Sequence, residues 1–270
     1  DMIALVVAQK YKTLKTQGNH NNEIGMPQTL FGLDSSYEAA VIEMGMSHQG
    51  EISRMSMSCQ PDVAVITNIG ISHIENLGTQ ENILKAKLEI LDGAAYDAPL
   101  ILCRDDKLLA GVQLHSDRKV YYYSVSKKDC DVYASGVKTV DNSITFTINY
   151  EGGKIAARIN CLGEHNVKNA LAAFCVGLAL DIPPEDIVKG IAQFKPEGLR
   201  QNVTVIDGVT YIVDCYNAAP DSMKASAFAC LEICWSLART QRPTTEMWES
   251  MLRLQRLTCF TALARTQSAI

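Results

Sequence analysis

The chain has 270 residues and a mass of 29.6 kDa, enough for one large domain or two modest ones. Its 47% hydrophobic and 20% charged residues are typical of a soluble folded protein and argue against disorder. The net charge of −5, with no basic stretch, argues against a nucleic-acid partner. No apolar run approaches the roughly 18 residues that a membrane helix needs.

The cysteines and the start of the chain indicate a cellular compartment. The nine cysteines are scattered, and only Cys230 and Cys234 lie close together, without the Cys-x-x-Cys spacing of a metal site. We expect reduced, mostly buried thiols in a cytosolic protein. No basic segment followed by an apolar core opens the chain, so no secretory signal is expected. The first residue is Asp1 rather than Met, which suggests that residues upstream are missing.

The first half of the chain alternates predicted helices and strands. Residues 1–11 are expected to be the end of a helix. Short runs rich in Val and Ile predict strands buried on both faces. The predicted strands are residues 39–44, 62–68, 100–103 and 120–125, and the predicted helices between them are residues 48–58 and 80–91. This alternation predicts an α/β fold with a mostly parallel sheet and flanking helices.

The pattern changes at about residue 131. Alternating apolar and polar residues predict three strands, with turns at residues 141–142 and 152–153, that form a small antiparallel segment attached to the parallel sheet; the strands are residues 131–138, 143–150 and 154–160. A long apolar helix is expected at residues 166–180, and a second one opens at Pro183-Pro184. Residues 203–206 and 210–214 predict a hairpin that turns at Asp207-Gly208.

The last 45 residues, 226–270, have a different composition. They contain no Gly, Asp, Asn, Lys, His, Val or Tyr, although both tryptophans and five arginines lie there. Because an α/β domain needs glycine at turns and helix ends, this tail does not continue the preceding domain.

Three residues in the first half point to phosphate and metal chemistry. Glu43 and His73 follow predicted strands beside Gly-containing loops, where open α/β sheets bind ligands. A carboxylate such as Glu43 suits Mg²⁺, and Lys87 supplies an amine from the predicted helix 80–91. Each also has an ordinary interpretation: an exposed strand-end acid, a surface or packing histidine, and a solvated helix lysine.

Two further segments are candidates for ligand contacts. Residues 19–25 (Asn-His-Asn-Asn-Glu-Ile-Gly) offer side-chain amides that can orient a polar ligand, although Asn also simply favours turns. Residues 163–169 (Gly-Glu-His-Asn-Val-Lys-Asn) open the long helix, where Asn166 can act as a cap and the helix end attracts anions. No complete Gly-x-x-x-x-Gly-Lys-Ser/Thr loop exists, and residues 152–154 (Gly-Gly-Lys) are interpreted as a turn.

Taken together, these segments resemble the Mur ligases. The resemblance covers residues 1 to about 225, and the segments that carry it are residues 18–27 (Gly-Asn-His-Asn-Asn-Glu-Ile-Gly-Met-Pro), 42–48 (Ile-Glu-Met-Gly-Met-Ser-His), 67–70 with 73–76, 86–90 (Ala-Lys-Leu-Glu-Ile), 165–172 and 214–223. It implies the family's central ATPase-type domain at residues 1–197, truncated at its N-terminus, and the start of its C-terminal domain at 198–225. The activity that the resemblance implies is the addition of D-Ala-D-Ala to UDP-N-acetylmuramoyl-tripeptide through an acyl phosphate in peptidoglycan synthesis.

The resemblance also implies roles for particular residues, with ATP and Mg²⁺ as cofactors and a monomer in the cytoplasm. Glu43, His73 and Lys87 would form the catalytic and metal-binding set, Lys87 as a carbamate. Asn19, Asn21 and Asn22 would contact substrate. The nucleotide would be held by His165, Asn166, Asn169, Arg200 and Asp214.

The match departs from the family at both ends. The family's phosphate loop should end a few residues before Asp1, so we expect this fragment to be inactive alone. The codons GAG ATA TGC TGG AGC TTG encode residues 232–237, and the same bases read two positions later give Asp-Met-Leu-Glu-Leu, a family-like stretch. Residues 226–270 are therefore predicted to be an out-of-frame tail. The alternatives are a non-catalytic remnant with weak or no nucleotide binding, and folylpolyglutamate synthase, which the Asn-Asn-Glu-Ile-Gly segment disfavours.

Overall fold

The computed structural model describes residues 1–114, 117–140, 142–196, 202–206 and 209–213, the last two stretches for their backbone only. All of them belong to the first of the two units into which the chain divides, Asp1–Phe228. No helix in this described part is long and apolar enough to cross a membrane.

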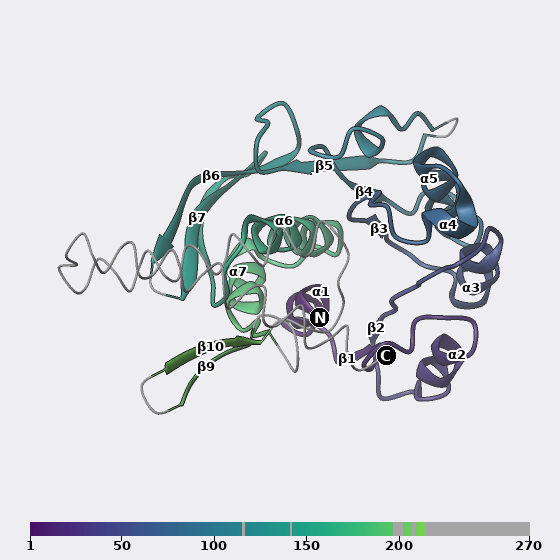
Figure 1. Cartoon of the computed structure of the whole chain (residues 1–270), viewed down its shortest axis with the longest axis horizontal. Helices are drawn as coiled ribbons and strands as arrows, with labels where there is room; N and C mark the ends of the chain where they lie inside the picture. The colour runs from purple at the N-terminus through teal and green to yellow at the C-terminus, as the bar shows by residue number, and fades with distance from the viewer. Residues whose placement is uncertain (115–116, 141, 197–201, 207–208, 214–270) are drawn as a thin grey trace. The chain divides into compact units, whose positions relative to one another are not determined.

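The largest sheet has six strands in the order β3-β4-β5-β6-β7-β8 (Figure 1). Their bounds are Ala64–Ile66, Leu100–Cys103, Val120–Ser124, Val132–Val140, Ser143–Tyr150 and Gly153–Ile159. The three pairs from β3 to β6 are parallel, and the two pairs from β6 to β8 are antiparallel. The predicted α/β class, a mostly parallel sheet with a small antiparallel segment, is confirmed.

Local sequence explains both halves of this sheet. Every residue of β4 is buried, as its unbroken apolar sequence predicts for a strand covered on both faces. The hairpin between β7 and β8 turns at Glu151-Gly152, and β8 begins at Gly153 with φ 135°, a conformation that L side chains rarely adopt. Gly152 therefore lies in the turn, as predicted, whereas Gly153 and Lys154 already belong to β8. The segment is part of a hairpin and not of a phosphate loop.

A separate parallel pair joins β1 (Thr13–Lys15) to β2 (Ala39–Val41), with α2 (Gly25–Leu30) between them in the chain. Strand β2 ends earlier than the predicted residue 44. The reason is that the N–H of Glu43 donates to the side-chain oxygen of Thr16 (2.9 Å) instead of joining a strand ladder. Glu43 consequently lies in the loop after the strand.

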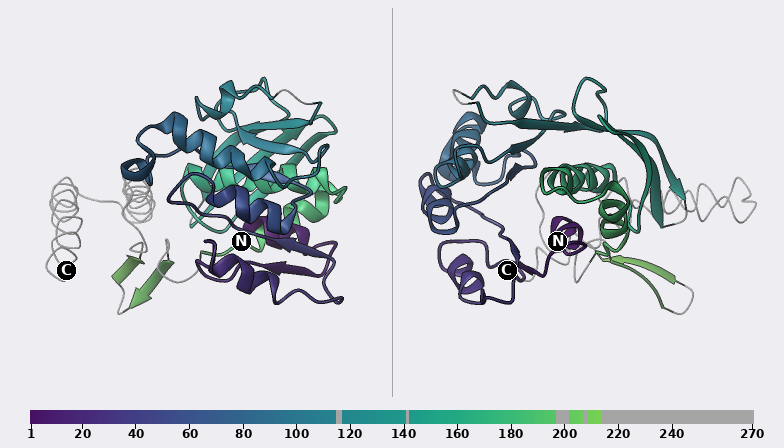
Figure 2. Two further views of the ribbon diagram at one scale, coloured as in Figure 1. Left: turned by 90° about the vertical axis from the view of Figure 1, so that its right-hand side faces the viewer. Right: turned by 180° about the vertical axis from the view of Figure 1, so that it is seen from behind.

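Three helices pack together beside the six-stranded sheet: α1 (Met2–Val7), α6 (Glu164–Ala179) and α7 (Pro184–Ala192). Helix α6 contacts β4, β5, β6 and β8, and Figure 1 and Figure 2 show it lying along one face of the sheet. A Cβ on Gly190 would lie 2.7 Å from the Cα of Val6, so glycine lets α7 approach the α1 backbone. Because α6 is apolar on nearly all sides, most of its side chains are buried, and the helix forms the centre of the core.

The remaining helical segments follow β2, β3 and β4. They are α3 (Glu51–Cys59), α4 (Ile74–Leu77), α5 (Gln80–Leu88), the 3₁₀ turn η1 (Glu89–Leu91) and a second 3₁₀ turn, η2 (Leu109–Gly111). Thr79 caps α5 by accepting the N–H of Asn82 (3.2 Å). The predicted helix 80–91 therefore exists, but its last turn tightens into η1.

Backbone pairing also confirms the predicted hairpin near residue 207. Strand β9 (Asn202–Ile206) pairs antiparallel with β10 (Val209–Val213), and Val209 is opposite Ile206. The predicted turn residues Asp207 and Gly208 lie outside the described residues.

The cysteines in the described part of the chain are free, as predicted: Cys59, Cys103, Cys130, Cys161 and Cys175. Burial raises the pKa of the Cys59 thiol to about 11 and that of Cys161 to about 12. These thiols are therefore protonated and weakly nucleophilic at neutral pH.

Candidate functional site

Glu43 and Asn21, both predicted as site residues, are in direct contact. The Glu43 Oε1 atom accepts a hydrogen bond from Asn21 Nδ2 (2.8 Å). The N–H of Gly45 donates to the Asn21 carbonyl (2.7 Å), and a Cβ on Gly45 would lie 3.1 Å from the Asn21 amide carbon. The Asn21 amide thus fixes the direction of an exposed carboxylate just beyond the end of β2.

The neighbouring asparagines have different surroundings. Asn22 Oδ1 accepts the N–H groups of Ile24 (3.1 Å) and Gly25 (2.8 Å), so this side chain closes the turn that begins α2. Asn19 is exposed, and its carbonyl accepts the N–H of Asn21 (2.7 Å). Asn22 therefore has a turn-forming role, and contacts of this loop with substrate stay a prediction.

His73 is exposed and directly precedes α4. Its φ of 64° lies in the left-handed region, and its carbonyl accepts the N–H groups of Asn76 and Leu77 (3.1 Å each). A residue other than glycine in this region is uncommon and is enriched at functional sites. Within the described part of the chain, no hydrogen bond joins the side chains of Glu43, His73 and Lys87.

The side chain of Lys87 is not extended along a solvated helix face. Its Nζ donates to the carbonyl of Asn68 (2.7 Å), just beyond β3, and the residue is half-buried. Burial lowers the pKa of Lys87, and the negative charge of Asp106 partly opposes that effect. At a given pH, Lys87 therefore has a larger share of neutral amine than an ordinary lysine.

The start of α6 brings three predicted residues together. The helix begins at Glu164 with Gly163 as its N-cap at φ 92°, so the prediction that Asn166 caps it is wrong. Gly163 takes a left-handed φ that suits glycine, and this starts the helix earlier. Buried Asn166 donates from Nδ2 to the Leu162 carbonyl (2.7 Å), and Asn169 Nδ2 donates to Asn166 Oδ1 (3.4 Å).

His165 lies at the same helix start. A Cβ on Gly163 would be 2.5 Å from its ring Cε1, so glycine at position 163 makes room for the imidazole. The other two residues predicted to hold nucleotide, Arg200 and Asp214, lie outside the described residues, as does the predicted tail 226–270.

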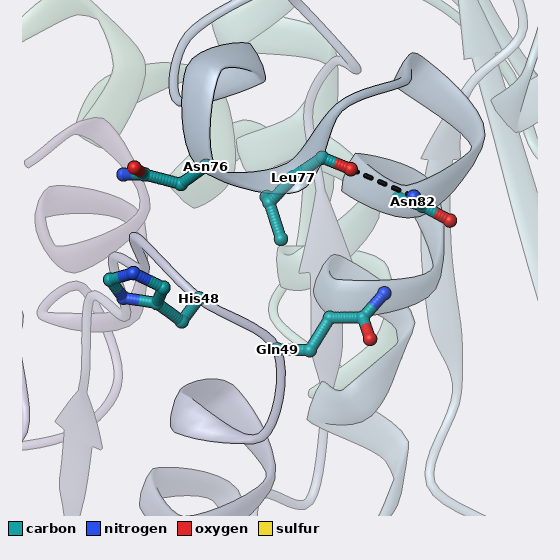
Figure 3. Close-up of a pocket in the computed structure, with 5 residues that line it drawn as sticks. All are labelled: His48, Gln49, Asn76, Leu77 and Asn82. Atoms are coloured by element: carbon teal, nitrogen blue, oxygen red, sulfur yellow. Dashed lines mark hydrogen bonds between the residues drawn. The ribbon is translucent and has the colours of Figure 1, made fainter.

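A cavity of about 240 Å³ lies between the segment before α3 and the α4–α5 region, lined by His48, Gln49, Asn76, Leu77 and Asn82. Figure 3 shows His48 and Gln49 opposite the residues of α4 and α5, and the Asn82 Nδ2 atom donates to the Leu77 carbonyl (2.7 Å). The cavity is lined by residues from two of the segments that carry the resemblance: His48 from 42–48 and Asn76 from 73–76. Gln49 and Asn82 carried no sequence signal, because their proximity arises only from the fold.

Among the described residues, a metal ion could be bound only by one or two protein side chains together with other ligands. No group of three or more His, Cys, Asp or Glu side chains there could hold a metal ion by itself. A magnesium ion that is shared with phosphates needs only one or two protein carboxylates. Glu43, an exposed carboxylate with one oxygen held by Asn21, has the donor chemistry for that arrangement.

Comparison with known proteins gives one consistent result. Residues 1–177 match the family described as the Mur ligase middle domain. The chain is 41% identical over 227 residues to the UDP-N-acetylmuramoyl-tripeptide–D-alanyl-D-alanine ligase of Bacillus subtilis, covering 84% of this chain and 48% of that protein.

Solved structures agree with this match. MurF from Acinetobacter baumannii superposes with a TM-score of 0.80 at 34% identity, covering 85% of this chain and 50% of the other. MurF ligase from Thermotoga maritima in complex with ADP gives a TM-score of 0.77 at 26% identity, covering 85% and 53%. The chain spans about half the length of the relatives it matches. With the matched domain covering most of its described residues, the chain belongs to the Mur ligase family.

Proposed function

We propose that this chain is the central part of an ATP-dependent amide ligase that adds D-Ala-D-Ala to UDP-N-acetylmuramoyl-tripeptide during peptidoglycan precursor synthesis. The observation that carries the proposal is the 41% identity to a ligase of that name over 227 residues. The half-buried amine of Lys87 and the exposed carboxylate of Glu43 support it. We also propose that the protein acts as a monomer in the cytoplasm.

The proposed reaction has two steps. The terminal carboxylate of the tripeptide attacks the γ-phosphorus of ATP, which forms an acyl phosphate and releases ADP. The free amine of D-Ala-D-Ala then attacks the acyl carbon, so that an amide bond forms, phosphate leaves and the amine loses a proton. Phosphoryl transfer of this kind depends on positioning and charge neutralisation more than on covalent help from the protein.

The candidate residues have complementary tasks in this proposal. Glu43 would hold Mg²⁺ and His73 a second Mg²⁺, and bound Mg²⁺ would neutralise phosphate charge. The neutral amine of Lys87 would attack CO₂ and lose one proton to form a carbamate, a new anionic oxygen donor. The lowered pKa of Lys87 favours this step, because only the neutral amine reacts.

The remaining proposed contacts concern substrate and nucleotide. Asn19, Asn21 and Asn22 would contact substrate. His165, Asn166 and Asn169 would meet the adenine at the start of α6, with Arg200 on phosphate and Asp214 on ribose. The hydrogen bond between Asn169 and Asn166 supports a shared role for these two amides.

The first test is an activity assay. We expect negligible turnover from the chain alone, because it spans about half the length of its relatives and contains no Gly-x-x-x-x-Gly-Lys-Ser/Thr loop. Extending it with the corresponding N-terminal and C-terminal parts of the Bacillus subtilis ligase should produce phosphate release that requires both UDP-N-acetylmuramoyl-tripeptide and D-Ala-D-Ala. Turnover with neither substrate, or no turnover from any such extension, would count against the proposal.

The competing interpretation is a non-catalytic remnant that binds nucleotide weakly or not at all. Calorimetric titration of the chain with Mg·ATP separates binding from its absence. Repeating the titration on the extended chain separates a remnant from the effect of missing segments. A remnant would bind weakly or not at all in either form, whereas the ligase proposal requires the extended chain to bind more tightly than the chain alone.

A further inference from the structure

Two consecutive peptide groups beside Lys87, Asn68–Ile69 and Ile69–Gly70, are held by three side chains from other segments. The Asn68 carbonyl accepts from Lys87 Nζ (2.7 Å), and the Ile69 carbonyl accepts from Gln80 Nε2 (2.9 Å). The Ile69 N–H donates to Oδ2 of Asp106 (2.7 Å). Ile69 itself is 2% exposed, so this stretch is anchored by packing as well.

Asp106 has a second set of bonds that fixes its own position. Its Oδ1 accepts the N–H groups of Leu108 (2.9 Å) and Leu109 (3.1 Å), and its own N–H donates to the carbonyl of Cys103 at the end of β4 (3.3 Å). The carboxylate thus joins the turn after β4 to the loop after β3 through two different oxygens. Charge-assisted bonds of this type are stronger than those between neutral groups.

This anchored loop leads directly to His73, whose left-handed backbone begins α4. The same loop supplies the acceptor that holds the Lys87 amine. Two of the three residues in the proposed catalytic set therefore depend on the position of one short segment, residues 68–73.

We propose that Asp106 is a positioning residue of the ligase: by clamping the Ile69 N–H it holds the loop that orients Lys87 and leads to His73. This inference rests on the proposed function for its catalytic meaning. Its structural content is independent of that function, because the clamp exists whether or not the chain turns over substrate.

The substitution Asp106→Asn tests the clamp selectively. An amide side chain has one acceptor oxygen where the carboxylate has two. If that oxygen keeps the bonds to Leu108 and Leu109, the NH₂ group faces the Ile69 N–H, donor against donor. Asp105→Asn is the matched control, since Asp105 accepts from Ser124, Val125 and Ser126 and makes no bond to residues 68–73.

Two measurements on the chain as it stands provide the readout. One is hydrogen–deuterium exchange of the segment 67–78. The other is the rate at which acetic anhydride acylates the neutral amine of Lys87, compared with Lys85 and Lys107 in the same molecule. This rate is taken from the pH dependence of the reaction, because loss of the Asp106 charge by itself lowers the pKa of Lys87. In Asp106→Asn we expect both to rise by about fivefold, the factor that loss of one such hydrogen bond gives. Lys85 and Lys107 should be unchanged, and Asp105→Asn should leave both readouts at the level of the parent chain.

A residue with a merely structural role would behave differently. If Asp106→Asn lowers the melting temperature but leaves the acylation of Lys87 unchanged, or if both variants raise it equally, the positioning role is overturned. These readouts need no nucleotide or turnover. An inactive extended ligase together with a selective response of Lys87 would therefore refute the proposed function and leave the clamp standing.

Discussion

Gly93 shows how one missing side chain permits a close approach of two segments. A Cβ at this position would lie 2.2 Å from the carbonyl carbon and oxygen of Ser56 and 2.4 Å from the nitrogen of Met57, all backbone atoms that cannot move aside. We expect Gly93→Ala to lower the free energy of unfolding by about 3 kcal/mol through overpacking. Urea denaturation measures this directly. In Gly111→Ala, where nothing lies within 4 Å of the added atom, the change should stay within about 0.5 kcal/mol.

Glu89 performs a task that is usually done by a helix's own cap. Its two carboxylate oxygens accept the N–H of Gly50 (2.8 and 2.9 Å), and Oε2 also accepts the N–H of Ser53 (3.3 Å), so it caps α3 from a distant segment. We expect Glu89→Gln to cost about 1 to 2 kcal/mol of unfolding free energy. The urea midpoint checks it, with Glu151→Gln in an exposed turn as the control. Equal midpoints for the two variants would contradict the capping role.

At the scale of elements, Asp105 joins the turn after β4 to the end of β5. It accepts bonds from Ser124 Oγ (2.6 Å) and the N–H of Val125 (2.9 Å). Burial, the largest single influence, would raise the pKa of Asp105, but the hydrogen bonds from Ser124, Ser126 and Val125 together bring it below the ordinary 3.8. Its pKa is therefore lower in the folded than in the unfolded state.

That sign determines a pH dependence. The stabilising contribution of Asp105 is fully present above the unfolded pKa and disappears as the pH falls through the lower, folded value. The gap in unfolding free energy between the parent chain and Asp105→Asn should be about 1 kcal/mol at pH 7 and should narrow below pH 3.8. Urea denaturation of both proteins at pH 7 and again below pH 3.8 measures this gap. A gap that widens in acid would show the assigned direction of the pKa shift to be wrong.

Two elements show where sequence patterns stop being sufficient. The apolar period of the helix predicted at 80–91 continues through Leu91, yet α5 ends at Leu88, where the next residue, Glu89, turns its side chain to Gly50. Strand β2 was predicted to reach residue 44 and ends at Val41 because Thr16 takes the N–H of Glu43. For β2, a side chain distant in the sequence takes the N–H that would continue the strand. For α5, the residue after the helix bonds to a distant segment, and no local pattern records either partner. The strands β6 to β8 were predicted to within a few residues, since their alternation and turns are local.

At the scale of the whole molecule, sequence motifs identified residues of the candidate site but not the side chains that hold the surrounding backbone in place. Glu43 and Lys87 stand in segments with a recognisable pattern, whereas Asp106 and Glu89 act through backbone N–H groups of other segments. A carboxylate that bonds to the backbone leaves no periodic signal. Contacts between separate segments therefore had to come from the fold, and the roles predicted for the site residues stay predictions.

The composition of residues 226–270 leads to a test on the gene. A tail without glycine, in a chain whose 17 glycines all lie earlier, is expected from an out-of-frame translation and not from an α/β domain. We expect the DNA that encodes this tail, read in one of the other two frames, to give a stretch like Asp-Met-Leu-Glu-Leu opposite residues 232–237. Sequencing of the genomic locus decides the matter. If neither alternative frame encodes a ligase-like sequence there, the tail is a genuine part of the protein and the predicted boundary at residue 226 is wrong.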